Sequence, residues 1–283
     1  MSGTGKVRTE RTSKQIFLGV KPPDDDNCKI WRYMDLSKFV WMIQNKALFF
    51  ANFKNFDDPF EGRFPYEDVI EICKSIRKEN TDISEEKALE NAKVYVKNTN
   101  GAIHEYADYF INCWHRNEFE SEAMWKIYSE LDMGIAIQST YKILDGCLLK
   151  YYESEEVFVG EVNYNKTTDW VHGIGNPTIY TPFYHKRISF EHEREIRAIM
   201  VRPKDNDQSK TMNNNHSNIL EYKRNSELIG LQVPISLEEL IKNVYISPKA
   251  SSYFTMLVKT ILKEYDCKDI NVIHSSLYDI NLY

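Results

Sequence analysis

The chain has 283 residues, of which 42% are hydrophobic and 13% are aromatic. That content is enough for a substantial core, in one large domain or two small ones, and lies outside the range of disordered proteins. The formal net charge of −6 does not support nucleic acid as a partner, because a sequence-independent grip on its backbone needs a strongly basic surface.

The cysteines and histidines announce no metal site. The five cysteines are scattered without a C-x-x-C pair, and the seven histidines contain no H-x-x-x-H or H-E-x-x-H pair. The N-terminus lacks an apolar signal-peptide core, and no apolar run approaches the roughly 18 residues of a membrane span. We therefore predict no metal, no membrane partner and a cytoplasmic location.

The first half of the chain opens on a polar segment. Residues 1–27 carry basic residues early and end in P-P-D-D-D-N, which predicts a mobile N-terminal arm ahead of a single domain at 28–283. An aromatic loop at 52–62 contains turns fixed by Pro59 and Gly62. Alternating or short apolar segments predict strands at 29–34, 47–51, 107–116 and 134–138, and periodic apolar residues predict helices after Asp35 or Ser37, over 66–98 and over 120–130.

The second half is interrupted by two polar segments. Residues 165–182 are expected to form a loop, and residues 205–218 are expected to be disordered or a variable insertion. Strands are predicted at 157–164, 228–234, 244–247 and 271–274, and helices from Ser236 and over about 250–265. Because strands and helices do not alternate regularly, we predict a single α+β domain with a mixed, mostly antiparallel sheet flanked by helices.

The central stretch at 190–200 has two interpretations. As a strand, it places Glu193, Glu195 and Arg197 on one face and Ile196, Ala198 and Met200 on the other. As a helix, Glu191 with Glu195 and Glu193 with Arg197 form i,i+4 pairs on a solvated face, and charge runs usually mark such faces. The strand interpretation predicts that these acids and Arg197 face a common cleft, close to the 56–62 loop, Arg32 and His115 or Trp114.

Several blocks of the sequence resemble an uncharacterised bacterial family catalogued as a domain of unknown function. They are R-Y-M-D-L at 32–36, L-F-F-A-N-F-K-N-F-D-D-P-F-E-G at 48–62, N-C-W-H at 112–115, A-M-W-K-I-Y-S and G-I-A-I-Q-S-T within 123–140, H-K-R-I-S-F-E-H-E-R-E-I-R-A at 185–198, and N-V-Y-I-S-P-K-A at 243–250. The resemblance runs from about residue 30 to 278. It implies a small bacterial protein of a family suspected of phage-defence or toxin-like roles.

A second resemblance is to ADP-ribosyltransferases of the Arg–Ser–Glu type. In those enzymes an early-strand arginine holds the NAD phosphates, and the second acid of a later Glu-x-Glu is catalytic. Arg32 and Glu193-x-Glu195 are similar to these two elements, whereas Cys113, Trp114 and His115 stand where a Ser-x-Ser is expected. The resemblance implies that NAD is the substrate, and that the partners are a nucleotide and an unknown macromolecular acceptor.

The candidate site follows from these blocks. A fixed carboxylate beside a ribose stabilises the oxocarbenium-like cation that forms when the nicotinamide bond breaks. Trp125 shares a helical face with Met124 and Tyr128, a spacing that also favours core packing. The candidates are Glu195, Glu193, Arg197 and His115 for catalysis, and Arg32, Tyr33, Asp58, Glu61, Trp125 and Lys186 for binding NAD.

Two other functional classes stay open. Asp58, Glu61, Glu193 and Glu195 are the ligand types of a divalent ion, as in a metal-dependent nuclease or phosphohydrolase. Alternatively, the acidic and arginine blocks form a structural ion-pair network in a non-enzymatic interaction or sensor module.

Overall fold

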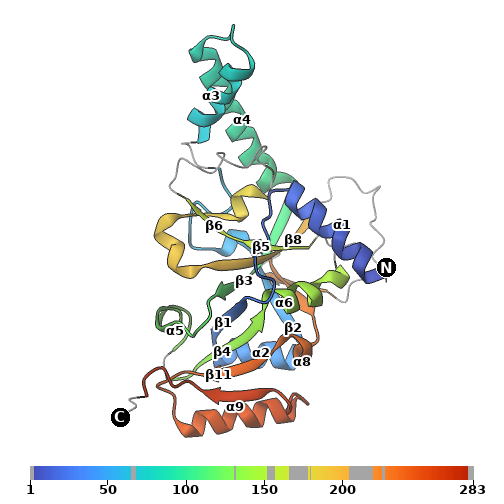
Figure 1. Cartoon of the computed structure of the whole chain (residues 1–283), viewed down its shortest axis with the longest axis vertical. Helices are drawn as coiled ribbons and strands as arrows, with labels where there is room; N and C mark the ends of the chain where they lie inside the picture. Colours follow the sequence, from blue (N-terminus) through green and yellow to red (C-terminus); the bar gives the residue numbers. More distant parts are fainter. Residues whose placement is uncertain are drawn as a thin grey trace.

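The fold is built on one large sheet (Figure 1). The structure is a computed structural model that describes residues 3–64, 68–130, 132–151, 157–165, 178, 180–203, 219–224 and 227–279. Within these residues ten strands form the main sheet, and only β11 with β12 pair in parallel there. The strands are β1 (Lys29–Asp35), β2 (Ala47–Asn52), β3 (Ala107–Arg116), β4 (Gly134–Thr140), β5 (Phe158–Glu161), β8 (Glu195–Pro203), β9 (Leu220–Arg224), β10 (Glu227–Pro234), β11 (Asn243–Ile246) and β12 (Asn271–His274).

The sheet forks at β3. Along one edge β3 pairs with β8 over its length, from Ala107 opposite Pro203 to His115 opposite Glu195. Its other edge is shared, because β2 pairs at Phe110 and Ile111 whereas β1 pairs only at His115 and Arg116. The edge between these two contacts, at 112–114, has no strand partner on that side in the described part of the chain. The arms that begin with β1 and β2 therefore diverge and leave room for a pocket.

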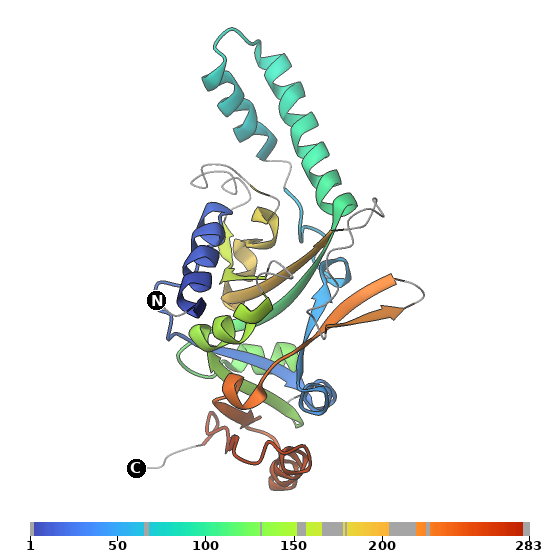
Figure 2. The ribbon, with the colours of Figure 1, turned by 90° about the vertical axis from the view of Figure 1, so that its right-hand side faces the viewer.

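Helices cover the sheet and extend beyond it. The pair α3 and α4 projects from one end of the molecule as an antiparallel hairpin, and α9 lies at the opposite end (Figures 1 and 2). The largest apolar cluster packs between one sheet face and α2, α6 and α9, and a second lies on the other face and runs into the hairpin. The helices are α1 (Gly3–Phe17), α2 (Leu36–Asn45), α3 (Asp68–Glu79), α4 (Glu85–Tyr106), α5 (Glu122–Tyr128), α6 (Tyr141–Leu148), α8 (Leu237–Leu240) and α9 (Ser252–Glu264).

Short elements complete the fold around the fork. A separate parallel pair joins β6 (Asn163–Asn165) to β7 (His185–Arg187). In the described part of the chain, four 3-10 turns join longer elements: η1 (Phe53–Asn55), η2 (Leu149–Tyr151), η3 (Thr181–Phe183) and η4 (Ile188–Glu193). The prediction of mixed helices and strands with a mostly antiparallel sheet is thus confirmed.

The prediction of a mobile N-terminal arm is wrong for the described residues before 28. Gly3–Phe17 form α1, and the buried Gln15 side chain donates to the Val159 carbonyl of β5. Val20 then enters the core with no exposed surface. The polar composition of the segment concealed this docking, because two buried side chains leave no apolar period in the sequence. The predicted insertion at 205–218 lies outside the described residues.

None of the helices in the described ranges combines the length and the apolar character that a membrane crossing requires.

Candidate active site

The central acidic stretch changes conformation at Arg194. It is a 3-10 turn up to Glu193, and Arg194 adopts a left-handed conformation with φ of 41°. From Glu195 the chain runs as strand β8 inside the sheet, so the helical interpretation is wrong and the strand interpretation holds for 195–200. The turn brings Glu193 and Glu195 to the same lysine, since Lys186 of β7 donates to both carboxylates.

A buried network of ion pairs surrounds Arg197. This side chain has no exposed surface and donates to Glu195 of β8, to both carboxylate oxygens of Glu61, and to the Phe183 carbonyl. The network joins β8, η3 and the 56–62 loop. Three buried carboxylates (Glu61, Glu193 and Glu195) thus meet two cations, Lys186 and Arg197.

Gly62 allows the loop to deliver Glu61 into this network. Its φ of 67° favours glycine, and an added Cβ would lie 2.5 Å from Cε1 of Phe183. The loop is also tied at its rim, because Arg187 donates to Asp58 at 3.1 Å and its guanidinium lies over the rings of Phe60 and Phe190. The sequence prediction that the 56–62 loop lies beside Glu193–Arg197 is therefore confirmed.

The pKa values of the two acids in the Glu-x-Glu element are shifted in opposite directions. Burial opposes the ionisation of Glu195, but the charges of Arg197 and Lys186 outweigh burial and lower its pKa to about 2. Burial, and after it the neighbouring Glu195, raises the pKa of Glu193. Glu195 is therefore a fixed negative charge, whereas Glu193 is the acid better suited to take up a proton.

His115 presents an unused nitrogen to the same region. Its Nδ1 lies 2.6 Å from the Glu193 carbonyl oxygen, which can only accept a hydrogen bond, so Nδ1 carries the proton. The buried Nε2 is then an acceptor, and it has no hydrogen-bond partner within the described ranges. Burial lowers the pKa of His115, which keeps the ring neutral at neutral pH.

These groups line a pocket of about 1140 Å³ at the fork. The strand registers place Ala51, Ile111 and Cys113 on one sheet face with Glu195, and all four line the pocket. Other lining side chains come from both arms and from the helices beside them: Arg32, Tyr33, Trp41, Phe49, Asp58, Glu61, His115, Tyr128, Lys186, Glu193 and Tyr222.

Arg32 is a cation of this pocket that no described residue pairs with. Strand β1 pairs with β3 only as far as Trp31. The next residue, Arg32, is half-buried and lines the pocket. Among the residues that the structure describes, its guanidinium has no hydrogen bond or ion pair, and burial lowers its pKa to about 10, so it stays charged. A half-buried cation without a partner carbonyl or carboxylate is suited to bind an anion.

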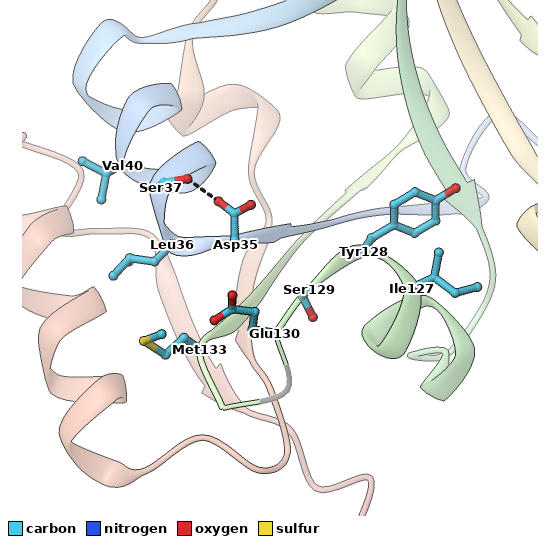
Figure 3. A pocket seen from close by; sticks show the side chains of 9 residues that line it. All are labelled: Asp35, Leu36, Ser37, Val40, Ile127, Tyr128, Ser129, Glu130 and Met133. Carbon is cyan, nitrogen blue, oxygen red and sulfur yellow. Dashed lines mark hydrogen bonds between the residues drawn. The ribbon is translucent and has the colours of Figure 1, made fainter. Parts of the chain in front are cut away.

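A second pocket of about 910 Å³ adjoins the first. Figure 3 shows its lining side chains, which come from the end of β1, the start of α2, the end of α5 and the segment that follows α5. Ser37, Ile127 and Tyr128 line both pockets. The hydroxyl of Tyr128 donates to Glu193 at 3.1 Å, so this side chain stands at the boundary between the two spaces.

Most predicted site residues meet in the pocket, and Trp125 does not. Tyr33 lines it, and its hydroxyl accepts from the Ser121 amide at 2.8 Å. Trp125 has no exposed surface, packs edge-on against Tyr33 at 5.0 Å between centroids, and donates to Glu120. The prediction that Trp125 binds NAD is therefore wrong, because the helical spacing with Met124 marks core packing.

Arg197 also differs from its prediction in one respect. It does not line the pocket but lies behind Glu195 with no exposed surface, so it acts on a ligand only through the carboxylates that it holds. Within the described ranges, no three His, Cys, Asp or Glu side chains are grouped so that they could hold a metal ion. The acids proposed as metal ligands are instead bonded to Arg187, Lys186 and Arg197.

The sequence interpretation missed two kinds of pocket residue. The helical spacing of Tyr128 with Met124 favours core packing, whereas its side chain lines the pocket and bonds to Glu193. The aromatic residues Trp41, Phe49 and Tyr222 were not considered, and they are distant in sequence. For Tyr222, the apolar Leu220 and Tyr222 alternate with charged residues in 220–224, but this pattern does not identify the residues that Tyr222 contacts.

No family model, no curated protein and no solved structure matches this chain. The two resemblances drawn from the sequence stay predictions, and any assignment of chemistry to the pocket rests on its own residues.

Proposed function

We propose that this protein binds a nucleotide, most simply NAD, in an ADP-ribosyltransferase-like fold, and transfers or hydrolyses its ADP-ribose moiety. The observation that carries the proposal is that one pocket holds both half-buried Arg32, which no described residue pairs with, and a pair of carboxylates, Glu193 and Glu195, beside neutral His115. An anion-binding cation next to fixed carboxylates suits an anionic ligand that develops positive charge during its reaction.

Arg32 holds the pyrophosphate in this proposal. A guanidinium offers bidentate hydrogen bonds that match phosphate geometry, and it stays charged throughout the physiological pH range. Because no described acidic side chain competes for Arg32, its full charge is available to the ligand.

Glu195 stabilises the ribosyl cation. The bond between the ribose C1 and the nicotinamide nitrogen breaks, and its electron pair leaves with nicotinamide, which departs as a neutral base. When Glu61, Glu193 and Glu195 are all ionised against Lys186 and Arg197, the cluster has a net charge of −1. That negative charge is held in a buried, low-dielectric position, where it strongly stabilises the positive charge that develops on the ribose.

Glu193 and His115 serve the incoming nucleophile, which is an acceptor group or water. A new bond forms between the nucleophile and C1, and the nucleophile loses a proton. Glu193 has a raised pKa and His115 has a free Nε2, so either group is suited to orient the nucleophile and accept that proton.

The experiment is a comparison of wild type with Glu195→Gln and Arg32→Met. Each protein is incubated with NAD labelled in the adenylate, with and without cell extract, and nicotinamide release, labelling and NAD affinity by calorimetry are measured. We expect Glu195→Gln to lose at least about 100-fold in release, the scale of one electrostatic catalytic group. Arg32→Met is expected to weaken NAD binding about 10- to 100-fold, the worth of a charge-assisted bidentate contact.

Arg202→Met is the matched control, since Arg202 lies on the same sheet outside the pocket and pairs with Glu221 at the surface. It should leave binding and release unchanged. A wild type that neither binds NAD nor releases nicotinamide rejects the proposal. If Glu195→Gln only lowers thermal stability and no turnover exists to be lost, the network is structural, as in an interaction module.

We also propose a cytoplasmic location, supported by the five free cysteines of the chain. The macromolecular acceptor and a defence or toxin-like role belong to this proposal as consequences of the family resemblance.

A further inference from the structure

Three aromatic side chains form the end of the pocket away from the acids. Trp41 comes from α2, Phe49 from β2 and Tyr222 from β9, and all three are half-buried and line the pocket. Their ring centroids lie 5.6 to 5.9 Å apart, with interplanar angles of 70° to 88°. This mutual edge-to-face packing leaves part of each ring surface open to the pocket.

The rings are held in place by their neighbours. An added Cβ on Gly230 of β10 would lie 2.2 Å from Cζ of Phe49, so glycine makes room for that ring. The hydroxyl of Tyr222 donates to Gln232 at 3.0 Å. Tyr222 is also the one side chain of β9 that is half-buried, whereas its neighbours on the strand are exposed. We call these three rings, Trp41, Phe49 and Tyr222, the platform. Because its rings are already held in place, the platform is suited to bind a planar ligand group.

The platform and the acids lie on opposite sides of β3. The strand order β8-β3-β2-β10-β9 puts Phe49 two strands from Glu195 and Tyr222 four strands from it, which is about 10 Å and about 19 Å at a strand spacing near 4.8 Å. Arg32 is nearer the acids, because the residue before it, Trp31, pairs with His115 of β3, and His115 pairs with Glu195. At about 1140 Å³, the pocket exceeds the usual range of roughly 300–1000 Å³ for small ligands.

We propose that Trp41, Phe49 and Tyr222 form a subsite for a purine base, and that the ligand is therefore a dinucleotide with its adenine on this platform. The inference rests on the proposed function, which puts the reacting ribose at Glu193 and Glu195 and the pyrophosphate at Arg32. The base beyond the pyrophosphate is then adenine, and nicotinamide lies at the acidic end.

The test measures the affinities of NAD, ADP-ribose, ADP and nicotinamide mononucleotide for wild type, Trp41→Leu and Tyr222→Leu. Each variant should weaken the three adenine ligands at least about tenfold, the scale of one base–ring stacking contact. Nicotinamide mononucleotide should lose less than about twofold, because it does not reach the platform. Tyr253→Leu, on the exposed outer surface of α9, is the matched control and should change no affinity.

The outcomes separate this inference from the proposed function. Equal losses for nicotinamide mononucleotide and ADP-ribose, or unchanged affinities in both variants, overturn the adenine subsite even if wild type releases nicotinamide. Adenine ligands that bind through the platform without any nicotinamide release support the subsite and reject the transferase proposal. If wild type binds none of the four ligands, both are rejected. Unfolding midpoints of both variants, measured in parallel, show that an affinity change is not a loss of folded protein.

Discussion

Two arginines at the fork of the sheet stand in opposite surroundings. Arg197, on the β8 side, is fully buried and bonded to Glu61, Glu195 and a backbone carbonyl. Arg32, on the β1 side, is half-buried, and no described side chain bonds to it. Lys186, close to Arg197, is again paired, with Glu193 and Glu195.

The difference separates charges that hold the fold from a charge that is free to bind. Ionised groups buried without partners are costly, so a network such as that around Arg197 stabilises the fold only while its members are all present. Arg32 makes no such contribution, and its desolvation is a cost that a bound anion would offset. The comparison predicts that replacing Arg197 lowers the stability of the fold, whereas replacing Arg32 leaves that stability nearly unchanged.

The largest effect is expected for Arg197→Met. Removing this guanidinium leaves Glu61 and Glu195 buried with one lysine for three acids, and we expect a loss of about 3–5 kcal/mol in the free energy of unfolding. Arg32→Met should change that free energy by less than about 1 kcal/mol, because it breaks no hydrogen bond or ion pair that the structure describes. Urea unfolding at pH 7 measures both values. Equal losses in the two variants would contradict the distinction between a structural and a binding arginine.

The next effect is the acid dependence of the Glu195 contribution. The folded pKa of about 2 lies below the usual value of 4.5, so the stabilisation is present above pH 4.5 and is lost as the pH falls from 4.5 toward 2. The shift corresponds to a contribution on the order of 3 kcal/mol at neutral pH. Glu193 has a raised pKa, so its contribution to stability increases as the pH falls. The stability curve of the wild type alone therefore mixes two opposite contributions.

The difference between wild type and Glu195→Gln isolates this contribution. Urea unfolding of both proteins between pH 7 and about pH 2.5 should show a stability gap that narrows steadily below pH 4.5. A gap that stays constant over this range would mean that the charge of Glu195 is not what Arg197 and Lys186 stabilise.

Much of this arrangement could be predicted from the sequence, because local patterns are strong in it. The alternation in 195–200 identified the face that carries Glu195 and Arg197, and turn residues marked the 56–62 loop beside them. Arg32 was identified only through a resemblance. The sequence does not say that β1 leaves β3 after Trp31, and that departure is what gives Arg32 its place in the pocket.

The remaining features depend on long-range register, which no local pattern encodes. Tyr222 meets Phe49 because β9 pairs with β10 across a bulge between Leu228 and Gly230. Glu193 and Glu195 reach one lysine because Arg194 is left-handed, a conformation unusual for a residue with a side chain. The α1 docking through Gln15 has the same origin, since its partner carbonyl is 144 residues away in sequence.

The smallest effect concerns Tyr128, which connects the acids to the neighbouring pocket of Figure 3. Tyr128→Phe removes the hydroxyl that donates to Glu193 at 3.1 Å, and we expect a loss of about 0.5–1.5 kcal/mol in the free energy of unfolding. A carboxylate that loses a donor is harder to ionise, so the pKa of Glu193 should rise further. The acidic limb of the pH profile of nicotinamide release should therefore move to higher pH.

Tyr184→Phe is the control for this last prediction, because the Tyr184 hydroxyl donates to the Phe158 carbonyl at 3.0 Å and lies outside the pocket. It should cost a similar free energy of unfolding and leave the pH profile in place. A profile that moves in neither variant would remove Glu193 from proton transfer and leave His115 as the proton acceptor. In that case His115→Gln, rather than Tyr128→Phe, should shift or abolish the acidic limb, since protonation of Nε2 would then be the step that limits release at low pH.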